Sequence, residues 1–368
     1  MGQRKRVSRV PRLLCKEVFC YSENSGFPLA FQQVVAKMNK TGKGRISMTS
    51  PVVYDEIVTA AARIAGVAVR TPLVRSDALD VATGARIFLK PENLQRTGSF
   101  KFRGAYNRLA AIAEADRAGG VVAYSSGNHA QGVALAARLL GLRATIIMPH
   151  DAPALKVERT RADGAEVIFY DRLTESREAI GGRIAADRGA TVVPPFDDRH
   201  VIAGQGTAGL EAAADLAAMG LTADVALLCC GGGGLASGFA VGSRAPVIAV
   251  EPENWDDVSK SLAAGKIIPV TDPRPTRCDA LQTLQMAELT FATLRGHGAT
   301  GHVVSESEVA RAVAFAFREL KLVVEPGGAV ALAAALAGRV DLVGKTVLVV
   351  LSGGNVEASV FAACLAEA

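Results

Sequence analysis

The segment Val225-Ala-Leu-Leu-Cys-Cys-Gly-Gly-Gly-Gly-Leu235 carries the clearest information about the fold. Its first five residues form an unbroken apolar run, as in a parallel strand that is buried on both faces. The four glycines predict a tight turn into a helical segment, where bare backbone amides converge on an anion. The turn matches neither the nucleotide loop nor the dinucleotide motif, so a single phosphate monoester fits it better. A tight turn without a ligand is the alternative.

The same alternation of strand and helix extends outward from this segment in both directions. We expect short apolar strands at residues 87–90, 121–124, 144–148, 167–170, 225–229, 247–250 and 346–351. We expect helices at residues 128–140, 175–186, 209–219 and 306–320, the last of which begins with a capping box of Ser305 and Glu308. This alternation predicts an α/β fold of parallel sheets with helices on both faces. Ligands of such folds bind where strand ends meet helix starts.

Composition and charge limit the class of protein. The 368 residues are 49% hydrophobic, which is enough for a large core in one or two lobes. Residues 1–47 contain ten Lys/Arg and two Asp/Glu, a net charge of +8, whereas the whole chain carries +5. The remaining residues therefore carry −3, and a mildly acidic body does not provide the basic groove of a nucleic-acid-binding protein.

The basic segment at residues 1–47 lacks periodic apolar residues, and we expect it to be a disordered N-terminal extension. A transit peptide is the alternative. No apolar run is long enough to cross a bilayer, so we expect a cytoplasmic protein without a membrane partner. The six cysteines lack paired C-x-x-C spacing, which predicts free thiols and no zinc site.

Lys101 is the strongest candidate for covalent chemistry. It lies between Phe100 and Phe102, and apolar surroundings lower the pKa of an amine, which favours Schiff-base formation with an aldehyde. For a lysine considered alone, an exposed position on a helix is the ordinary alternative.

Five motifs follow one another along the chain. The first is Lys90-Pro-Glu-Asn-Leu-Gln-Arg-Thr-Gly-Ser-Phe-Lys-Phe-Arg-Gly-Ala105. The others are Ser125-Ser-Gly-Asn-His-Ala-Gln131, Ala203-Gly-Gln-Gly-Thr207, the tetraglycine turn and Ser352-Gly-Gly-Asn-Val356. In this order they closely resemble the threonine dehydratase and serine racemase family, fold type II of the pyridoxal-phosphate enzymes. The resemblance covers nearly all of the chain after Met48 and implies two open, twisted parallel-sheet lobes with the cofactor between them.

The resemblance implies that pyridoxal 5'-phosphate is the cofactor and that Lys101 forms a Schiff base with it. It also implies that Phe100 lies against the cofactor ring, that Asn128 contacts the ring hydroxyl and that Ser352 faces the pyridine nitrogen. The phosphate would bind to the main-chain amides of Gly231, Gly232, Gly233, Gly234 and Leu235. A serine beside the pyridine nitrogen makes a weaker electron sink than a carboxylate, which favours loss of a β-hydroxyl over transamination.

The same resemblance implies the substrate contacts, which would come from Ser125, Ser126, Asn128, His129 and Arg177. Ser126 matches a serine of the racemase branch on the cofactor face opposite the lysine, where it would reprotonate the α-carbon. A turn serine, or a donor to the substrate carboxylate, is the alternative. Arg177 resembles a carboxylate-binding arginine of that branch, and its planar guanidinium group would suit the second carboxylate of 3-hydroxyaspartate. A solvated helix arginine is the alternative.

A divalent cation is implied by Glu251 and Asp257, which match the acidic metal ligands of the racemase branch. Trp255 stands where that branch contributes a main-chain oxygen, although the family usually has a smaller residue there. Oxygen ligands of this kind suit Mg²⁺ or Ca²⁺. Without a metal, Asp256 and Asp257 would simply begin the following helix favourably for its dipole.

The expected activity is dehydration and deamination of serine, threonine or 3-hydroxyaspartate to a 2-keto acid and ammonia, and the sequence does not rank these substrates. One alternative is a racemase of serine or aspartate with β-elimination as a side activity. The other is a cofactor-binding protein without turnover. The resemblance also implies a homodimer, a large cofactor-binding domain at residues 48–119 and 198–368, and a small mobile domain at residues 120–197.

Overall fold

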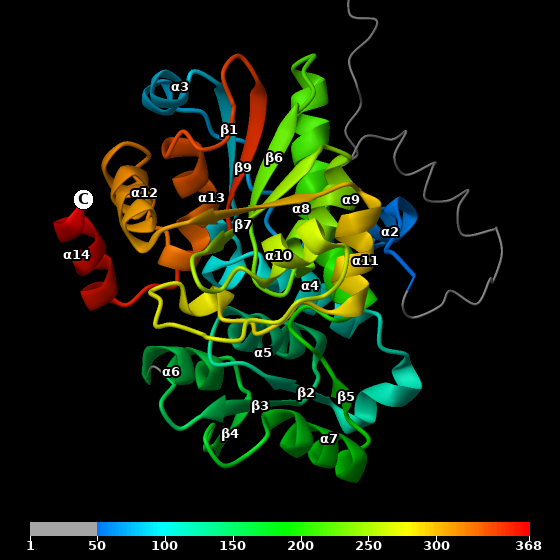
Figure 1. Ribbon diagram of the computed structural model, residues 1–368. Helices are drawn as coiled ribbons and strands as arrows, with labels where there is room; N and C mark the ends of the chain where they lie inside the picture. Colours follow the sequence, from blue (N-terminus) through cyan, green and yellow to red (C-terminus); the bar gives the residue numbers. More distant parts are fainter. Residues whose placement is uncertain (1–49, 153) are drawn as a thin grey trace, which may run out of the picture. The chain divides into compact units, whose positions relative to one another are not determined.

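The computed structural model describes residues 50–152 and 154–368 (Figure 1). The expected extension at residues 1–47, with Cys15 and Cys20, lies outside the described residues. The free thiols predicted from the cysteine spacing are confirmed for Cys229, Cys230, Cys278 and Cys364, which are all buried. Within the described ranges, no helix is long and apolar enough to cross a membrane.

A five-stranded parallel sheet forms the larger lobe, in the upper half of Figure 1. Its strands follow the order β1-β9-β6-β7-β8, and all neighbouring strands run parallel. The strands are β1 (Arg86–Pro91), β6 (Val225–Cys229), β7 (Val247–Pro252), β8 (Thr300–Val304) and β9 (Thr346–Leu351).

Helices cover both faces of this sheet because its strands are apolar on both sides. Leu227 and Val349 join a core with α3, α12 and α13, whereas Leu228 and Val350 join a second core with α8, α9, α10 and α11. Successive side chains of a strand point to opposite faces, so one apolar run serves two cores. These helices are α3 (Asp77–Thr83), α8 (Arg199–Ala218), α9 (Gly234–Ser243), α10 (Asp257–Ala264), α11 (Glu288–Gly296), α12 (Glu306–Arg318) and α13 (Pro326–Leu336).

A four-stranded parallel sheet in the order β4-β3-β2-β5 forms the smaller lobe. Ala123 and Met148 pack with α4 and α5 on one face, and Val122 and Ile147 pack with α7 on the other. The elements are α4 (Lys101–Ala110), β2 (Val121–Tyr124), α5 (Asn128–Leu140), β3 (Ala144–Pro149), α6 (Ala154–Ala162), β4 (Glu166–Tyr170), α7 (Arg177–Arg188) and β5 (Thr191–Val192). Both sheets belong to the same compact unit of the chain.

The remaining elements complete the fold. They are the helices α2 (Tyr54–Ile64) and α14 (Ala358–Glu367), with short 3-10 helices at Glu92–Leu94, Arg96–Gly98, Glu114–Gly119 and Asp279–Leu281. The predicted α/β fold of two parallel-sheet lobes with helices on both faces is confirmed.

The structure differs from the expected elements in a few places. The strands β5 and β8 stand where no strand is expected, because β5 has two residues and β8 is a mostly half-exposed edge strand without an apolar run. Helix α8 begins at Arg199, well before the expected start at residue 209, since Gly204 and Gly206 give its first half a low helix propensity. The capping box of Ser305 and Glu308 is confirmed at the start of α12.

Candidate active site

A cavity of about 470 Å³ lies where the carboxyl ends of strands from both lobes meet the start of α4. Parallel strands end at one edge of a sheet, which brings together segments that are far apart in the sequence. The expected cofactor and substrate residues that line the cavity are Phe100, Lys101, Ser125, Ser126, Asn128, His129, Arg177, Gly231, Gly232, Gly233, Gly234, Leu235 and Ser352.

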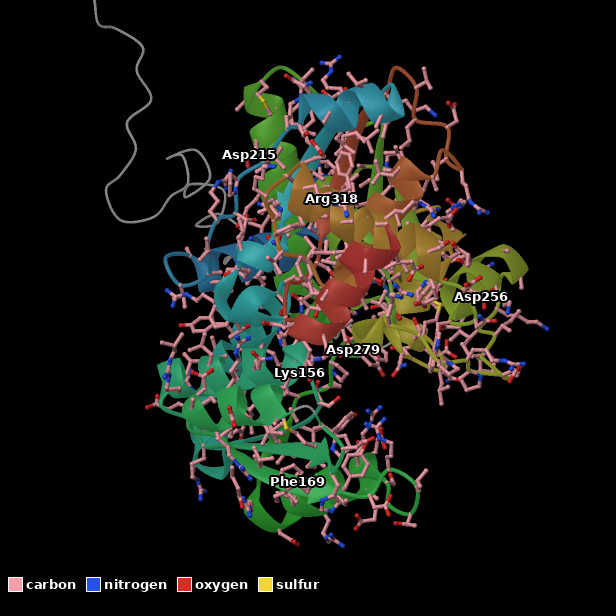
Figure 2. The ribbon with its side chains drawn as sticks, turned by 90° about the vertical axis from the view of Figure 1, so that its left-hand side faces the viewer. Lys156, Phe169, Asp215, Asp256, Asp279 and Arg318 are labelled. Carbon is pink, nitrogen blue, oxygen red and sulfur yellow. The ribbon has the colours of Figure 1, made fainter. Side chains whose placement is uncertain are left out.

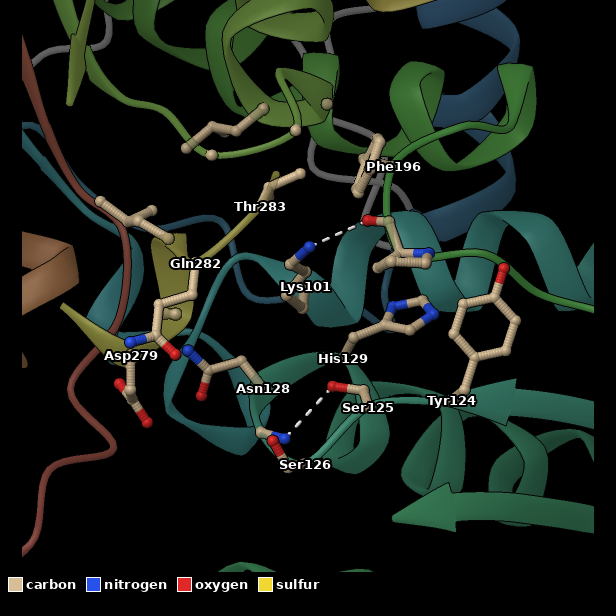
Figure 3. Close-up of a pocket in the computed structure, with 18 of the residues that line it drawn as sticks. Lys101, Tyr124, Ser125, Ser126, Asn128, His129, Phe196, Asp279, Gln282 and Thr283 are labelled. Carbon is tan, nitrogen blue, oxygen red and sulfur yellow. Dashed lines mark hydrogen bonds between the residues drawn. The ribbon is translucent and has the colours of Figure 1, made fainter. Parts of the chain in front are cut away.

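Lys101 is the first residue of α4, and its side chain lines the cavity (Figure 3). Its Nζ donates a hydrogen bond to the Pro195 carbonyl oxygen at 2.9 Å and lies 5.2 Å from the centre of the Phe100 ring. Burial lowers the pKa of Lys101 to about 8, and the neighbouring carboxyl group of Glu325 partly offsets this shift. At pH 7 roughly a tenth of the Lys101 side chains are therefore amines, far more than for an exposed lysine, and the amine is the form that attacks an aldehyde.

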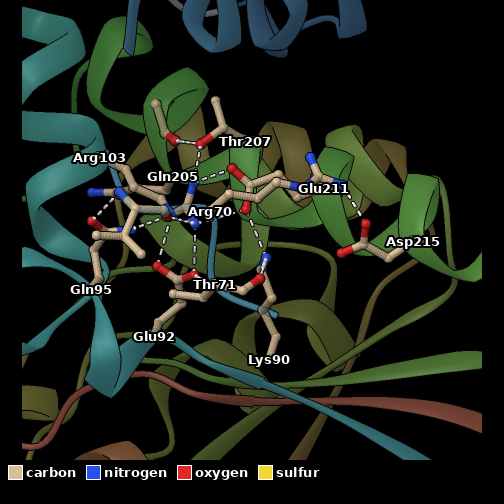
Figure 4. Close-up of polar contacts among 12 residues, drawn as sticks. Arg70, Thr71, Lys90, Glu92, Gln95, Arg103, Gln205, Thr207, Glu211 and Asp215 are labelled. Atoms are coloured by element: carbon tan, nitrogen blue, oxygen red, sulfur yellow. Dashed lines mark hydrogen bonds and ion pairs between the residues drawn. The ribbon is translucent and has the colours of Figure 1, made fainter. Parts of the chain in front are cut away.

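A buried ionic network holds α4 against α8 (Figure 4). Arg103 of α4 donates to Glu92 at 2.7 Å and to Glu211 of α8 at 2.8 Å. Lys90 donates to the same Glu211 carboxylate at 2.7 Å. Each of these buried charges has a partner of opposite sign, as burial requires. The network therefore fixes the helix from which Lys101 reaches the cavity.

The segment before Lys101 is fixed against the end of β9. The Phe100 amide donates to the Ser352 carbonyl oxygen at 3.1 Å, and Ser352 is itself buried at the cavity wall. Gly98 has a φ of +71°, and a Cβ there would lie 2.8 Å from the side-chain oxygen of Asn355. Both its backbone angle and this close contact require glycine at position 98.

The tetraglycine turn Gly231–Gly234 leads from β6 into α9 and lines the cavity, as the sequence predicts. Gly233 has a φ of +85°, and a Cβ on Gly232 would lie 2.4 Å from the ring of Phe196. The turn thus needs glycine for its conformation and for its contact with Phe196. The first amides of α9 have no partner within the helix, so this end of the helix favours an anion such as a phosphate.

The turn between β2 and α5 supplies Ser125 and Ser126, and the start of α5 supplies Asn128 and His129; all four lie below Lys101 in Figure 3. Ser125 Oγ accepts a hydrogen bond from the Gly127 amide at 3.2 Å. His129 Nε2 lies 2.9 Å from the Val193 carbonyl oxygen, which only accepts, so Nε2 is the donor. Burial and the charge of Lys101 lower the pKa of His129 to about 3, so its ring is neutral.

Arg177 begins α7 and lies at the rim of the cavity, with 47% of its side chain exposed. Its guanidinium lies 5.4 Å from the centre of the Tyr124 ring, and its Nε donates to Glu178 at 2.8 Å. Because both side chains of this ion pair are exposed, water screens their attraction. A carboxylate entering the cavity can therefore replace Glu178 as the partner of Arg177.

Two further groups that line the cavity, Lys156 and Asp279, and one beside it, Glu325, have no role that the sequence predicts. Lys156 of α6 pairs with Asp279, and Figure 2 shows the two where the smaller and larger lobes join. Glu325 is buried and accepts a hydrogen bond from Asn128 at 2.6 Å. These pairs join residues 123 and 197 positions apart, so no local spacing reveals them.

The expected metal ligands lie away from the cavity. Glu251 and Asp257 are buried, and burial raises the pKa of Glu251 to about 8 and that of Asp257 to about 7. Glu251 already accepts from the Ser259 amide and hydroxyl, both at 2.7 Å, whereas the Asp257 oxygens make no hydrogen bond in the described part of the chain. The Trp255 indole donates to the Arg274 carbonyl oxygen at 2.8 Å. Among residues 50–152 and 154–368, no group of three or more His, Cys, Asp or Glu side chains could hold a metal.

Two parallel-sheet lobes, a cavity lysine of lowered pKa and a glycine turn at a helix N-terminus fit an aldehyde cofactor that carries a phosphate. The chain belongs to the family described as "Pyridoxal-phosphate dependent enzyme", which matches residues 64–353. The resemblance stated from the motifs is thereby confirmed.

Individual relatives narrow the comparison. The chain is 45% identical over 317 residues to the L-threo-3-hydroxyaspartate ammonia-lyase of a Pseudomonas species, which covers 85% of this chain and 98% of that protein. It is 42% identical over 309 residues to the protein of the same name from Saccharomyces cerevisiae, covering 83% and 93%. The structure of maize serine racemase matches 87% of this chain and 98% of its own, with a TM-score of 0.80 and 35% identity.

Proposed function

We propose that this protein removes water and then ammonia from a small β-hydroxy amino acid, and that L-threo-3-hydroxyaspartate is its preferred substrate. The observation that carries the proposal is the cavity itself, which combines the amine of Lys101, the tetraglycine turn and the cationic Arg177. The two relatives named for L-threo-3-hydroxyaspartate support the choice of substrate. The products would be oxaloacetate and ammonia.

Pyridoxal 5'-phosphate fits the residues that line the cavity. The amides of residues 231–235 would hold its phosphate, and Lys101 would bind its aldehyde carbon. Phe100, Asn128 and Ser352 would contact the ring. When bound, the cofactor supplies an electron sink for negative charge at the substrate α-carbon.

Once the substrate amine has taken its place on the aldehyde carbon, the freed amine of Lys101 would move the proton at the substrate α-carbon. Because its pKa is about 8, the amine acts as a general base close to physiological pH. Loss of the β-hydroxyl with this proton amounts to loss of water. The released enamine tautomerises to an imine, which water hydrolyses to the keto acid and ammonia.

The two carboxylates of 3-hydroxyaspartate need two anion-binding groups. We assign the α-carboxylate to the Ser125–Ser126 turn, because the N-terminus of α5 favours an anion. We assign the β-carboxylate to Arg177, which exchanges Glu178 for the substrate. Serine and threonine lack the second carboxylate and leave Arg177 with its present partner, so they should be poorer substrates.

The experiment is keto-acid release from the purified protein with pyridoxal phosphate, measured for L-threo-3-hydroxyaspartate, its other isomers, L-serine and L-threonine. Oxaloacetate formed with the highest kcat/KM supports the proposal. Faster release of pyruvate or 2-oxobutyrate would reject hydroxyaspartate as the preferred substrate and keep the dehydratase reaction. If the protein binds the cofactor but releases no keto acid from any substrate, the result would support a cofactor-binding protein without turnover.

Ser126 carries the second candidate function, an amino-acid racemase with elimination as a side activity. Inversion of the α-carbon needs a second proton carrier on the face opposite Lys101. Ser126 lines the same cavity and lies below Lys101 in Figure 3. Chiral analysis of recovered substrate in the parent and in Ser126→Ala separates the two reactions. Racemisation that disappears in the variant while keto-acid release continues would support this function.

We also propose that Mg²⁺ or Ca²⁺ binds to Glu251, Asp257 and the main-chain oxygen of Trp255, with water completing the shell. The unpartnered oxygens of Asp257 support this, since a cation would compensate two buried carboxyl groups.

Added Mg²⁺ or Ca²⁺ should raise the unfolding temperature of the parent and have no effect on the unfolding temperature of Asp257→Asn. The control is Asp256→Asn, whose side chain pairs with Lys260 and which should respond as the parent does. Equal responses of both variants would reject the site.

Three expectations from the sequence stay predictions. They are the homodimer, the cytoplasmic location and the division into a large domain (48–119 and 198–368) and a small mobile domain (120–197). Light scattering after size-exclusion chromatography tests the homodimer. Hydrogen exchange with and without substrate tests whether residues 120–197 move as a unit.

A further inference from the structure

Glu325 is a buried carboxyl group beside the cavity that the proposed reaction does not use. It is 1% exposed and stands at the N-cap of α13, yet its side chain makes no capping hydrogen bond to that helix. Its Oε1 instead accepts a hydrogen bond from Asn128 Nδ2 at 2.6 Å. Its Oε2 has no partner among the described residues.

The Asn128 amide is held from both ends, which fixes its orientation. Its oxygen accepts a hydrogen bond from Asn355 Nδ2 at 2.8 Å. The same Asn355 nitrogen donates to the Thr97 carbonyl oxygen at 2.6 Å, so the Asn355 amide cannot be reversed. Asn128 therefore turns its nitrogen toward Glu325, and one hydrogen of that nitrogen stays free for a ligand.

Asn128 lines the cavity together with Lys101 (Figure 3). In pyridoxal phosphate the ring hydroxyl stands on the carbon next to the aldehyde, so it must lie close to the amine of Lys101. We propose that Glu325 is a positioning residue that orients the Asn128 amide so that its free N–H donates to this ring oxygen. The inference rests on the family's cofactor and is independent of which amino acid is the substrate.

The backbone at the end of β9 supports this arrangement. A Cβ on Gly353 would lie 2.1 Å from Glu325 Oε1 and 3.1 Å from Asn128 Nδ2. Any other residue at this position would displace the carboxyl group from the amide. Gly353 also follows Ser352, so the contact between Glu325 and Asn128 lies directly beside the cavity wall.

The charge on Glu325 depends on groups from several elements. Burial raises the pKa of Glu325 to about 8 and Asp279 adds to this, whereas the other neighbours oppose it. The charged and titratable groups around it are Asp279, Lys156, Lys101 and Cys229. Glu325 is therefore mostly neutral at neutral pH, and its carbonyl oxygen still accepts from Asn128. Glutamine offers the same carbonyl oxygen and should replace it.

The experiment compares Glu325→Gln with Glu325→Asp in the holoenzyme. Glutamine keeps the acceptor oxygen at the same distance from the backbone. Aspartate is one methylene shorter and loses the hydrogen bond from Asn128. The readouts are the dissociation constant of pyridoxal phosphate, from fluorescence titration, and the visible absorption band of the bound cofactor across pH. E325Q should match the parent at neutral pH, and E325D should bind the cofactor about tenfold more weakly, with a shifted pH profile of the band.

Asn128→Ala tests whether Glu325 acts through Asn128. If it does, N128A/E325D should bind the cofactor no more weakly than N128A alone. The matched control is Glu308→Gln, another buried glutamate at the start of a helix, which pairs with Arg339 and should leave both readouts unchanged. Parental affinity and spectrum in E325D, equal losses in E325Q and E325D, or additive losses in the double variant would overturn the proposal. None of these readouts uses keto-acid release, so a failure of the substrate assignment would be recognised separately.

Discussion

Lys101 has a pKa of about 8 because its surroundings disfavour the ammonium form, whereas an exposed lysine has a pKa of about 10.4. We therefore expect the rate of pyridoxal phosphate uptake by the apo-protein to rise with pH up to about 8 and then level off, since the amine fraction stops growing. Stopped-flow absorbance measures this rate. A rate that keeps rising toward the pKa of an exposed lysine would contradict the burial of this amine.

Arg177 should decide between substrates with and without a β-carboxylate. We expect Arg177→Met to lower kcat/KM for L-threo-3-hydroxyaspartate by about 100-fold, the value of a charge-assisted contact. The kcat/KM for L-serine should change by less than about threefold, because serine has no group for this contact. Steady-state assays test this, with Arg183→Met on the exposed side of the same helix as the control. An equal loss for both substrates would assign Arg177 to the α-carboxylate instead.

Much of the candidate site could be predicted from the sequence because its residues stand in short contiguous motifs. Lys101, the turn at residues 125–129, the turn at 231–235 and Ser352 all reach one cavity, as expected, and their individual contacts with the cofactor stay predictions. Glu325 could not be predicted, because its role depends on a partner 197 positions away. Such a pair exists only once α13 and α5 have been brought together by the fold.

At the scale of elements, the close contact between α4 and α8 depends on glycine. A Cβ on Gly204 would lie 2.6 Å from the Arg103 carbonyl oxygen, so Gly204→Ala should destabilise the protein by about 1–3 kcal/mol. Gly182 in α7 has no heavy atom within 4 Å of an added Cβ, and Gly182→Ala should stabilise by up to about 1 kcal/mol. Urea unfolding measures both changes. Equal effects of the two substitutions would contradict the close contact between α4 and α8.

The strands were easier to predict than their order. Apolar runs such as residues 225–229 and 346–351 reveal buried strands, because both faces of these strands need apolar partners. The order β1-β9-β6-β7-β8 depends instead on which strands pair across long stretches of chain, and no local pattern encodes that choice. Helix α8 shows the same limit: its glycines lower its helix propensity, and only the close packing of α4 and α9 against it explains them.

At the scale of the whole molecule, cofactor removal should lower stability. A ligand at a hundred times its dissociation constant stabilises the folded state by about 2.7 kcal/mol when it does not bind the unfolded chain. We therefore expect a higher unfolding temperature for the holo-protein than for the apo-protein, and a smaller difference in Lys101→Ala, which loses the covalent bond. Thermal unfolding followed by circular dichroism measures this. Identical unfolding temperatures of apo- and holo-protein would contradict the assignment of the cavity as the cofactor site.

Every functional assignment at the cavity depends on Lys101 holding the cofactor. Borohydride reduction of the holo-protein followed by peptide mass spectrometry tests this directly, because reduction makes the bond between lysine and cofactor permanent. Lys101 and Lys156 both line the cavity, so the two lysines are the competing sites of attachment. We predict a pyridoxyl label on Lys101 and none on Lys156. A label on Lys156, or no label on either lysine, would contradict the proposed site.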